Sequence, residues 1–284
     1  MERQNANPLF RDKIISILKM GTTQDVINKV LDVNAMKLYT RAFTSKTANV
    51  HYNYEVLEHL GDLIANTCLG LYFSERFPHL FNHPQGQNIL SRLKIKYVDS
   101  KSWALIAEKL GFFQFAIVNP DQKKECLDSK EKRQKLLEDI FEAFMGATNK
   151  IFDQKYMLGS GFIVIRKIIK GLLNDAYPVI ELTRKSLYDS KTRLKEYFDA
   201  SEVKLFFNNS IKNLQYRHNK ETKSVQVYLV LLNAQPIKLG EGQGETSNET
   251  EKIAAEKSIE NIKNYFTPQQ GWPVDKREGV SFEV

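Results

Sequence analysis

The chain has 284 residues, of which 42% are hydrophobic, so it is long enough for two globular domains with cores of their own. Its net charge of +7 suits a polyanionic partner. No apolar run approaches the length of a transmembrane helix, and the first residues lack the apolar core of a secretory signal, so we expect no membrane partner.

Helical spacing dominates the first 175 residues. The stretches with this pattern cover residues 9–20, 25–45, 54–77 and 85–170. The third is expected to end at Pro78, because proline has no backbone N–H to continue the helical hydrogen bonds. Breaks in the fourth are expected near Asn119-Pro120 and at residues 159–161. We therefore predict an all-α domain over residues 1–175.

The pattern changes after a linker expected at residues 176–188. A helix from Ser190 to Asp199 precedes alternating, β-rich segments that include residues 224–232 and 236–240, and a helix is expected over residues 250–266. This order predicts a small α+β domain, α-β-β-β-α, over residues 189–266. Residues 267–284 contain proline and glycine without periodicity, so we expect a mobile tail, although Trp272 could anchor it.

Two acidic motifs stand out within the helical domain. One places Glu55, Glu58 and Asp62 at i, i+3 and i+7, and the other places Asp139 and Glu142 at i, i+3. The sequence has no Lys or Arg between positions 46 and 76 or within 136–149, which argues against ordinary salt bridges. Clustered carboxylates on apolar helices call for a compensating cation, and Mg2+ prefers oxygen ligands. The alternative is two solvated helix faces, and spacing alone does not show that the helices meet.

At these residues the chain resembles the ribonuclease III family. Residues 55–62, EVLEHLGD, are similar to the family signature E-x-L-E-F-L-G-D, and residues 139–143 resemble its second motif, D-x-x-E-A. Residues 90–111 are similar to the connecting helices of the family, and residues 189–198 resemble the opening helix of its double-stranded-RNA-binding domain. Several motifs in the correct order are far more specific than one.

The resemblance implies that Glu58, Asp62, Asp139 and Glu142 coordinate catalytic Mg2+, with Mn2+ as a substitute, and that Glu55 is an accessory residue. The implied reaction is endonucleolytic hydrolysis of double-stranded RNA, which leaves 5′-phosphate and 3′-hydroxyl ends with short 3′ overhangs. In such a site one metal makes a water nucleophilic while a second stabilises the departing 3′ oxygen.

A homodimer is also implied, since each subunit of such an enzyme supplies one acidic centre. Gly61 and His59 are the predicted interface positions. Gly61 has no side chain and so permits a close approach of helices. His59 stands where the family usually has a Phe that enters a socket on the partner. Either the imidazole packs in that socket in the same way, or it makes the dimer weaker and sensitive to pH.

Predicted RNA contacts lie in the C-terminal domain and before the second acidic motif. Thr192, Lys195 and Glu196 match the first-helix contact positions of the RNA-binding domain, and Lys220 and Lys223 lie in its first β-turn. Residues 247–251 contain two acids where the family has a lysine-rich phosphate clamp, so we expect weak RNA binding. The basic run over residues 123–135 either steers phosphates or is a solvated loop.

Two other functions remain open on the same fold. A non-catalytic double-stranded-RNA-binding or ribosome-associated protein would be expected to lose metal-ligand acids, yet all four are present. A protein-interaction scaffold would require RNA binding to be dispensable. The cysteines, Cys68 and Cys126, indicate no disulfide framework, so we expect a reducing, cytoplasmic location, with the nucleus as the alternative.

Overall fold

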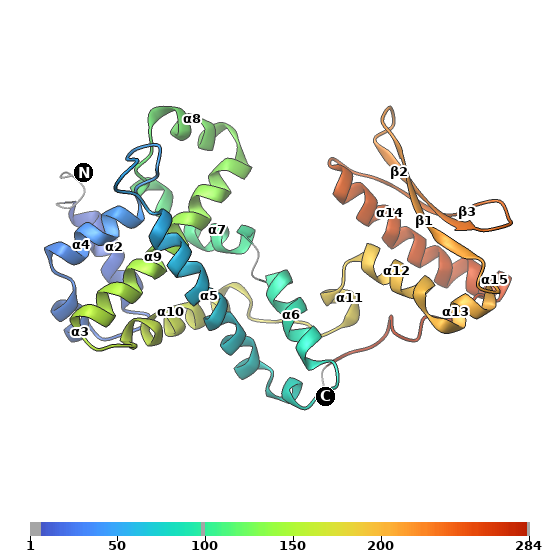
Figure 1. Cartoon of the computed structure of the whole chain (residues 1–284), viewed down its shortest axis with the longest axis horizontal. Helices are drawn as coiled ribbons and strands as arrows, with labels where there is room; N and C mark the ends of the chain where they lie inside the picture. Colours follow the sequence, from blue (N-terminus) through green and yellow to red (C-terminus); the bar gives the residue numbers. More distant parts are fainter. Residues whose placement is uncertain (1–6, 98–99, 283–284) are drawn as a thin grey trace. The chain divides into compact units, whose positions relative to one another are not determined.

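The computed structural model describes residues 7–97 and 100–282, and the chain divides into two compact units, Met1–Ile180 and Glu181–Val284 (Figure 1). The first unit is built of helices, and the second combines helices with a three-stranded antiparallel sheet. The predicted fold class is confirmed. Among the described residues, no helix combines the length and the apolar character needed to cross a membrane.

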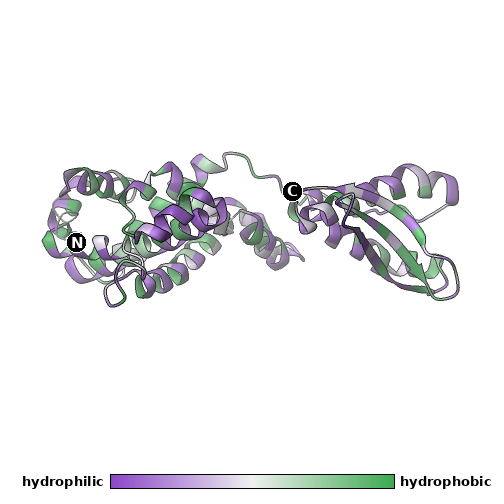
Figure 2. Cartoon of the chain, turned by 90° about the horizontal axis from the view of Figure 1, so that it is seen from above, coloured by the Kyte–Doolittle hydropathy of each residue, from purple (hydrophilic) through white to green (hydrophobic). Residues whose placement is uncertain are grey.

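The first unit follows the predicted helical pattern closely. Its helices are α2 (Pro8–Leu18), α3 (Gln24–Val30), α4 (Val33–Ala42), α5 (Glu55–Arg76), η1 (Pro78–Phe81), α6 (Gly86–Tyr97), α7 (Ser100–Lys109), η2 (Phe112–Phe115), α8 (Pro120–Asp128), α9 (Lys130–Lys155) and α10 (Ser160–Ala176). Purple and green stretches alternate along these ribbons in Figure 2, as expected for amphipathic helices.

Local sequence sets the helix boundaries of the first unit. The Asn119 side chain accepts a hydrogen bond from the Gln122 N–H at 2.8 Å, and Pro120 occupies the first turn of α8, so the predicted break is the start of a capped helix. The other predicted break is also confirmed, because Gly159 adopts a left-handed conformation, with φ of +84°, between α9 and α10.

Helix α9 forms the centre of the first unit. Every residue from Leu136 to Thr148 is buried, including the acidic ones, because α4, α5, α7 and α10 pack around this helix. Aromatic side chains fill the space on one side, where Tyr39 stacks on Phe144 with ring centroids 5.5 Å apart. The acids of the second motif therefore lie in the core of the unit.

The second unit has the predicted α-β-β-β-α order. Its elements are α11 (Arg184–Leu187), α12 (Ser190–Asp199), α13 (Ser201–Phe206), β1 (Ile211–Asn219), β2 (Ser224–Leu231), β3 (Ile237–Gln243), α14 (Ser247–Asn261), η3 (Ile262–Phe266) and α15 (Thr267–Gln270). The strands pair antiparallel in the order β1-β2-β3, and α14 packs on β2 and β3 beside α12. Alternate residues Val225, Val227 and Leu229 of β2 face this helical layer and form its core.

The chain ends of the second unit differ from the sequence prediction. Part of the expected linker packs inside the unit, where Leu182 is fully buried and its carbonyl accepts a hydrogen bond from the Phe282 N–H at 2.6 Å. Trp272 is buried and stacks on Phe266 with ring centroids 4.4 Å apart. The tail thus packs against the domain over its described residues, because scattered aromatic anchors hold it without any helical or strand periodicity.

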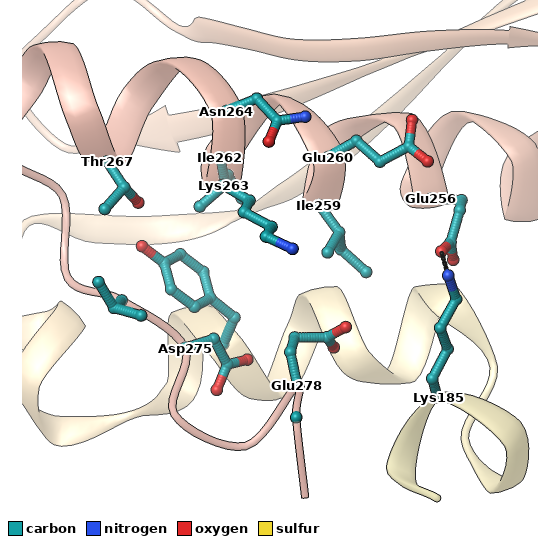
Figure 3. A pocket seen from close by; sticks show the side chains of 13 residues that line it. Lys185, Glu256, Ile259, Glu260, Ile262, Lys263, Asn264, Thr267, Asp275 and Glu278 are labelled. Atoms are coloured by element: carbon teal, nitrogen blue, oxygen red, sulfur yellow. Dashed lines mark ion pairs between the residues drawn. The ribbon is translucent and has the colours of Figure 1, made fainter.

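The packed tail encloses a cavity of about 570 Å³ against α14 (Figure 3). Its lining mixes both signs of charge, with the acids Glu256, Glu260 and Glu278 and the bases Lys185 and Lys263. The Lys185 ammonium lies 3.8 Å from a Glu256 oxygen, and both Glu256 and Glu278 also pair with the buried Arg193. Arg193 thereby joins Glu278 of the tail to Glu256 of α14.

Candidate active site

Two glycines let α5 and α9 cross almost in contact. A Cβ placed on Gly61 would lie 1.8 Å from the carbonyl oxygen of Glu142, and one on Gly146 would lie 2.0 Å from the carbonyl oxygen of Leu57. Both distances are far shorter than any non-bonded contact, so only glycine fits at either position. The crossing sets the separation of the acidic side chains on the two helices.

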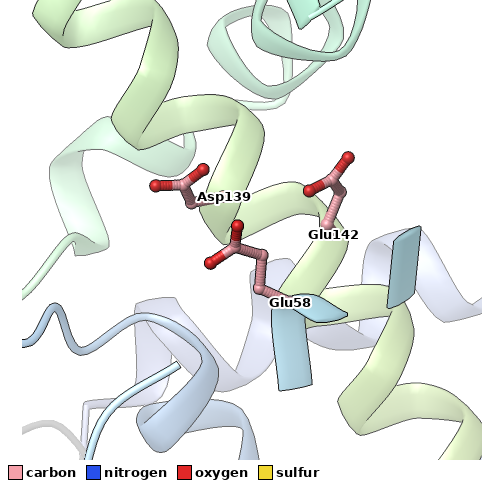
Figure 4. A group of neighbouring side chains, drawn as sticks. All are labelled: Glu58, Asp139 and Glu142. Carbon is pink, nitrogen blue, oxygen red and sulfur yellow. The ribbon is translucent and has the colours of Figure 1, made fainter. Parts of the chain in front are cut away.

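Three acids converge at this crossing. Glu58 projects from α5 toward Asp139 and Glu142 of α9 (Figure 4). Each offers a carboxylate oxygen, and these oxygens all lie within 4.8 Å of one another. The structure therefore shows that the two acidic helices meet, which their spacing in the sequence left open. The interpretation of both motifs as separate solvated faces is wrong.

The three carboxyls are poorly solvated and repel one another. Glu142 is only 6% exposed, and burial together with the charges of Glu138, Asp62 and Glu58 raises its pKa to about 8. Burial and the neighbouring charge of Asp139 raise the pKa of Glu58 to about 7. Burial also raises the pKa of Asp139. Without a bound cation, this group holds protons at pH values where free carboxyls are ionised.

Asp62 and Glu138 lie at the edge of the cluster. The predicted ligand Asp62 stands one turn beyond Glu58 on α5 and accepts a hydrogen bond from Asn66 at 2.8 Å. It lies outside the group of three, although its charge contributes to the raised pKa of Glu142. Glu138, which is 8% exposed and precedes Asp139, was not among the residues predicted from the sequence. Its i, i+4 spacing to Glu142 was a signal that could have revealed it.

Cations are nearer to the acids than the sequence pattern indicated. Lys46 pairs with Glu55 at 3.0 Å, so Glu55 is an exposed ion-pair partner outside the cluster. Lys135, one residue before the stretch without basic residues, lies 2.7 Å from Oδ1 of Asp139 and 3.4 Å from Glu138. The prediction that the acids lack salt-bridge partners is therefore wrong for Glu55 and Asp139.

The two oxygens of Asp139 have different partners. The buried Tyr54 hydroxyl donates to Oδ2 at 3.1 Å and fixes the orientation of the carboxylate. Oδ1 is buried and, within the described chain, receives no hydrogen bond, since the Lys135 contact has ion-pair distance without hydrogen-bond geometry. A buried carboxylate oxygen that already faces a cation, beside two further carboxylates, fits a hard divalent cation.

Comparison with known proteins agrees with this site. The family model of the ribonuclease III domain matches residues 55–149, which span both acidic motifs. The putative ribonuclease 3 of Invertebrate iridescent virus 6 is 29% identical over 89% of this chain and 87% of its own length. The chain belongs to the ribonuclease III family. The resemblance seen in the two motifs is confirmed.

Relatives of this ribonuclease III family member come from viruses and bacteria. The putative ribonuclease 3 of Frog virus 3 is 39% identical over 60% of this chain and 44% of its own length. The ribonuclease 3 of Campylobacter curvus is 27% identical over 80% of this chain and 92% of its own length. The family and these relatives identify the chain as an endoribonuclease that acts on RNA.

The predicted interface residues of the ribonuclease III domain have different environments. Gly61 is buried against α9 of its own chain, so its assignment to a dimer interface is wrong. The glycine serves the close approach of helices within the domain. His59 is exposed on the opposite side of α5, and its predicted place in an interface stays a prediction.

Some predicted RNA contacts in the second unit are exposed, and others have partners within the chain. Lys195, Lys220 and Lys223 are exposed, and Lys195 lines a groove of about 580 Å³ between α12 and β1. The Thr192 hydroxyl donates to Asp189 at 2.8 Å. Glu196 instead pairs with the buried Arg184 at 2.5 Å and thereby holds the segment before α12, so this carboxylate is committed within the chain rather than to RNA.

In the basic run over residues 123–135, some side chains form ion pairs within the chain and others are exposed. Lys132 lies 2.7 Å from Glu125 and Arg133 lies 2.5 Å from Glu108. Both are therefore committed to ion pairs at the surface. Lys123, Lys124 and Lys130 are exposed and stay available for phosphates.

Proposed function

We propose that this chain is a Mg2+-dependent endoribonuclease that cleaves both strands of double-stranded RNA and leaves 5′-phosphate and 3′-hydroxyl ends with short 3′ overhangs. The convergence of Glu58, Asp139 and Glu142 at the crossing of α5 and α9 carries this proposal. These carboxylates would hold divalent ions, Mg2+ or Mn2+ as its substitute, which would activate a water and stabilise the departing 3′ oxygen.

The residues of the chain hold and shape this centre. Glu58, Asp139 and Glu142 present the ligand oxygens, and we assign Asp62 to the outer edge of the same centre because it acts on Glu142. Tyr54 orients Asp139 through its hydroxyl hydrogen bond. Burial on α9 excludes bulk water from the carboxylates and strengthens their interaction with a cation.

We propose that the working form is a homodimer formed through the exposed face of α5. Val56, His59 and Leu63 have i, i+3, i+7 spacing on this face, and Val56 and Leu63 are 68% and 54% exposed. This face lies opposite the residues that pack on α9. Large apolar side chains exposed together on a helix favour burial against a second copy, which would bring two acidic centres to one duplex.

The second unit is proposed to bind duplex RNA weakly through Lys195, Lys220 and Lys223. Its α14 N-terminus is a poor phosphate site, because Glu251 there pairs with Lys191 and lies 3.0 Å from His218. The Glu251 carboxylate is thus already paired with Lys191, the cation that faces this helix end. Fewer free cations mean fewer displaced counterions and weaker binding to phosphates. The two free cysteines of the first unit, Cys68 and Cys126, are buried, which suits the proposed reducing, cytoplasmic location.

Duplex cleavage with and without metal tests the proposed function. The purified full chain is incubated with a long RNA duplex, or with either of its strands alone, in Mg2+ or in EDTA. We expect short duplex products in Mg2+, uncleaved duplex in EDTA and little cutting of single strands. Duplex binding without cleavage in Mg2+ and in Mn2+ would instead support the non-catalytic RNA-binding alternative.

A further inference from the structure

Lys135 holds a position that a bound cation would need. It lies on the first part of α9, one turn before Asp139, and its ammonium group stands 2.7 Å from Oδ1 of Asp139. It also lies 3.4 Å from Oε2 of Glu138. Oδ1 of Asp139 is the buried carboxylate oxygen that receives no hydrogen bond from the described residues. The ammonium group therefore lies at the oxygen best suited to a metal.

The Lys135 side chain is free to leave. It is 63% exposed, whereas the side chains of Glu138 and Asp139 are 10% and 11% exposed. The cation thus reaches into the cluster from solvent on a flexible stem, while the acids are fixed by the packing of α9. Outward rotation of the lysine costs no core packing.

The positive charge of Lys135 offsets the mutual repulsion of the clustered carboxylates. The charge of Lys135 lowers the pKa of Glu58, Asp139 and Glu142, against the effects of burial and mutual repulsion. It therefore acts on all three members of the cluster. A divalent cation at Oδ1 and the ammonium group would repel one another at such short range, so the two compete for this oxygen.

We propose that Lys135 is a built-in competitor of the divalent cation, which neutralises Asp139 and Glu138 while the metal is absent and sets the metal concentration at which the site fills. This inference rests on the proposed function. It assigns to Lys135 a positioning role that acts through Asp139, with no contact to the reacting atoms.

Mn2+ binding to the full chain without RNA tests this role independently of activity. Free Mn2+ is measured by its electron paramagnetic resonance signal for the wild type, Lys135→Gln and Lys132→Gln. Lys132 is the matched control, since it lies one turn earlier on α9, is 56% exposed and pairs with Glu125, outside the cluster. We expect Lys135→Gln to lower the Kd for Mn2+ by about 3- to 10-fold, and Lys132→Gln to change it by less than about 2-fold.

A second variant separates competition from a change in folding. Lys135→Arg keeps a cation beside Asp139, so its Kd for Mn2+ should equal or exceed that of the wild type. Unchanged affinity in Lys135→Gln, or an equal gain in Lys132→Gln, overturns the inference while leaving the proposed function standing. If the wild type shows no saturable Mn2+ binding that Glu142→Gln removes, the proposed metal centre fails and the inference fails with it.

Discussion

The carbonyl oxygen of Glu142 occupies the space beside Gly61, where an added Cβ would lie only 1.8 Å away. The residue that supplies a carboxylate to the cluster thus also supplies the backbone contact that defines the helix crossing. Gly146 makes the reciprocal contact with Leu57. Geometry at the acidic site therefore depends on two positions that have no functional group of their own.

Gly61→Ala should separate α5 from α9 and weaken both folding and metal binding. The methyl group would meet backbone, which cannot rotate away, so we expect a loss of about 3 kcal/mol or more in the free energy of unfolding. Urea denaturation measures this change in the free energy of unfolding. Gly70→Ala is the control on the same helix, because a Cβ placed there meets no atom of the described residues within 4 Å apart from its own helix backbone, and it should stabilise by roughly 0.5–1 kcal/mol. Equal effects of the two substitutions would contradict the proposed crossing.

Removing the Glu142 charge should stabilise the metal-free protein at high pH. The pKa of Glu142 is about 8 in the folded protein and ordinarily 4.5, so the folded state holds a proton that the unfolded chain releases between these pH values. Stability is therefore lost as pH rises through this window. In EDTA at pH 8, Glu142→Gln should be more stable than the wild type by on the order of 2 kcal/mol, and the gain should vanish near pH 4.5.

Thermal unfolding in EDTA at pH 5 and pH 8 checks this expectation. Glu131→Gln is the matched control, since Glu131 lies exposed in the first turn of the same helix. A saturating divalent cation should reverse the order, because it stabilises the ionised cluster of the wild type. A Glu142→Gln variant that is less stable than the wild type at pH 8 in EDTA would show that the carboxylate is not strained by burial and repulsion.

Leu63→Glu should disrupt the proposed dimer without unfolding the subunit. Leu63 is 54% exposed and lies on the α5 face opposite α9, so a charge there is solvated in the monomer and buried unpaired in the dimer. Sedimentation velocity should show a dimer for the wild type and a monomer for the variant. Leu127→Glu, at another exposed leucine on α8, should stay dimeric. A monomeric wild type at micromolar concentration contradicts the proposed interface.

Glu251→Gln should strengthen RNA binding by the second unit. The substitution releases Lys191 and His218 from their internal carboxylate, so both can face phosphates at the α14 N-terminus. The slope of log K against log salt should steepen by about 0.9 for each additional phosphate that the protein neutralises, if duplex RNA behaves like B-DNA. Glu249→Gln removes an equal charge from an exposed position in the first turn, and should leave the slope unchanged. Identical slopes for both variants would contradict the inference that Glu251 keeps Lys191 from binding phosphates.

Sequence periodicity was sufficient to predict the helices and to identify the acidic residues that they carry. The long apolar helix over residues 54–77 and the break at Asn119-Pro120 follow from local rules, so both were predictable. The convergence of Glu58 with Asp139 was not, because spacing along one helix carries no information about its neighbour. Contact between the helices depends on the pairing of Gly61 with the α9 backbone, which is a tertiary property.

The errors at the site also have physical causes. Lys135 precedes the acidic stretch by one residue and so falls outside it in the sequence, yet the helical i, i+4 relation brings it to Asp139. Gly61 was assigned to a contact between subunits, although the nearest backbone belongs to its own chain. The tail has no periodic pattern, so the sequence predicted mobility with Trp272 as the alternative anchor, and it is this anchor that the structure shows buried against Phe266.

Cleavage by the pair Glu142→Gln and Glu131→Gln tests the central claim most directly. Both remove one carboxylate from α9, but only Glu142 belongs to the acidic cluster. With a long RNA duplex in saturating Mg2+, Glu142→Gln should lose on the order of 100-fold or more in cleavage rate while keeping its affinity for the duplex, and Glu131→Gln should cut like the wild type. Near-normal cleavage by Glu142→Gln would contradict the assignment of this cluster as the catalytic metal centre.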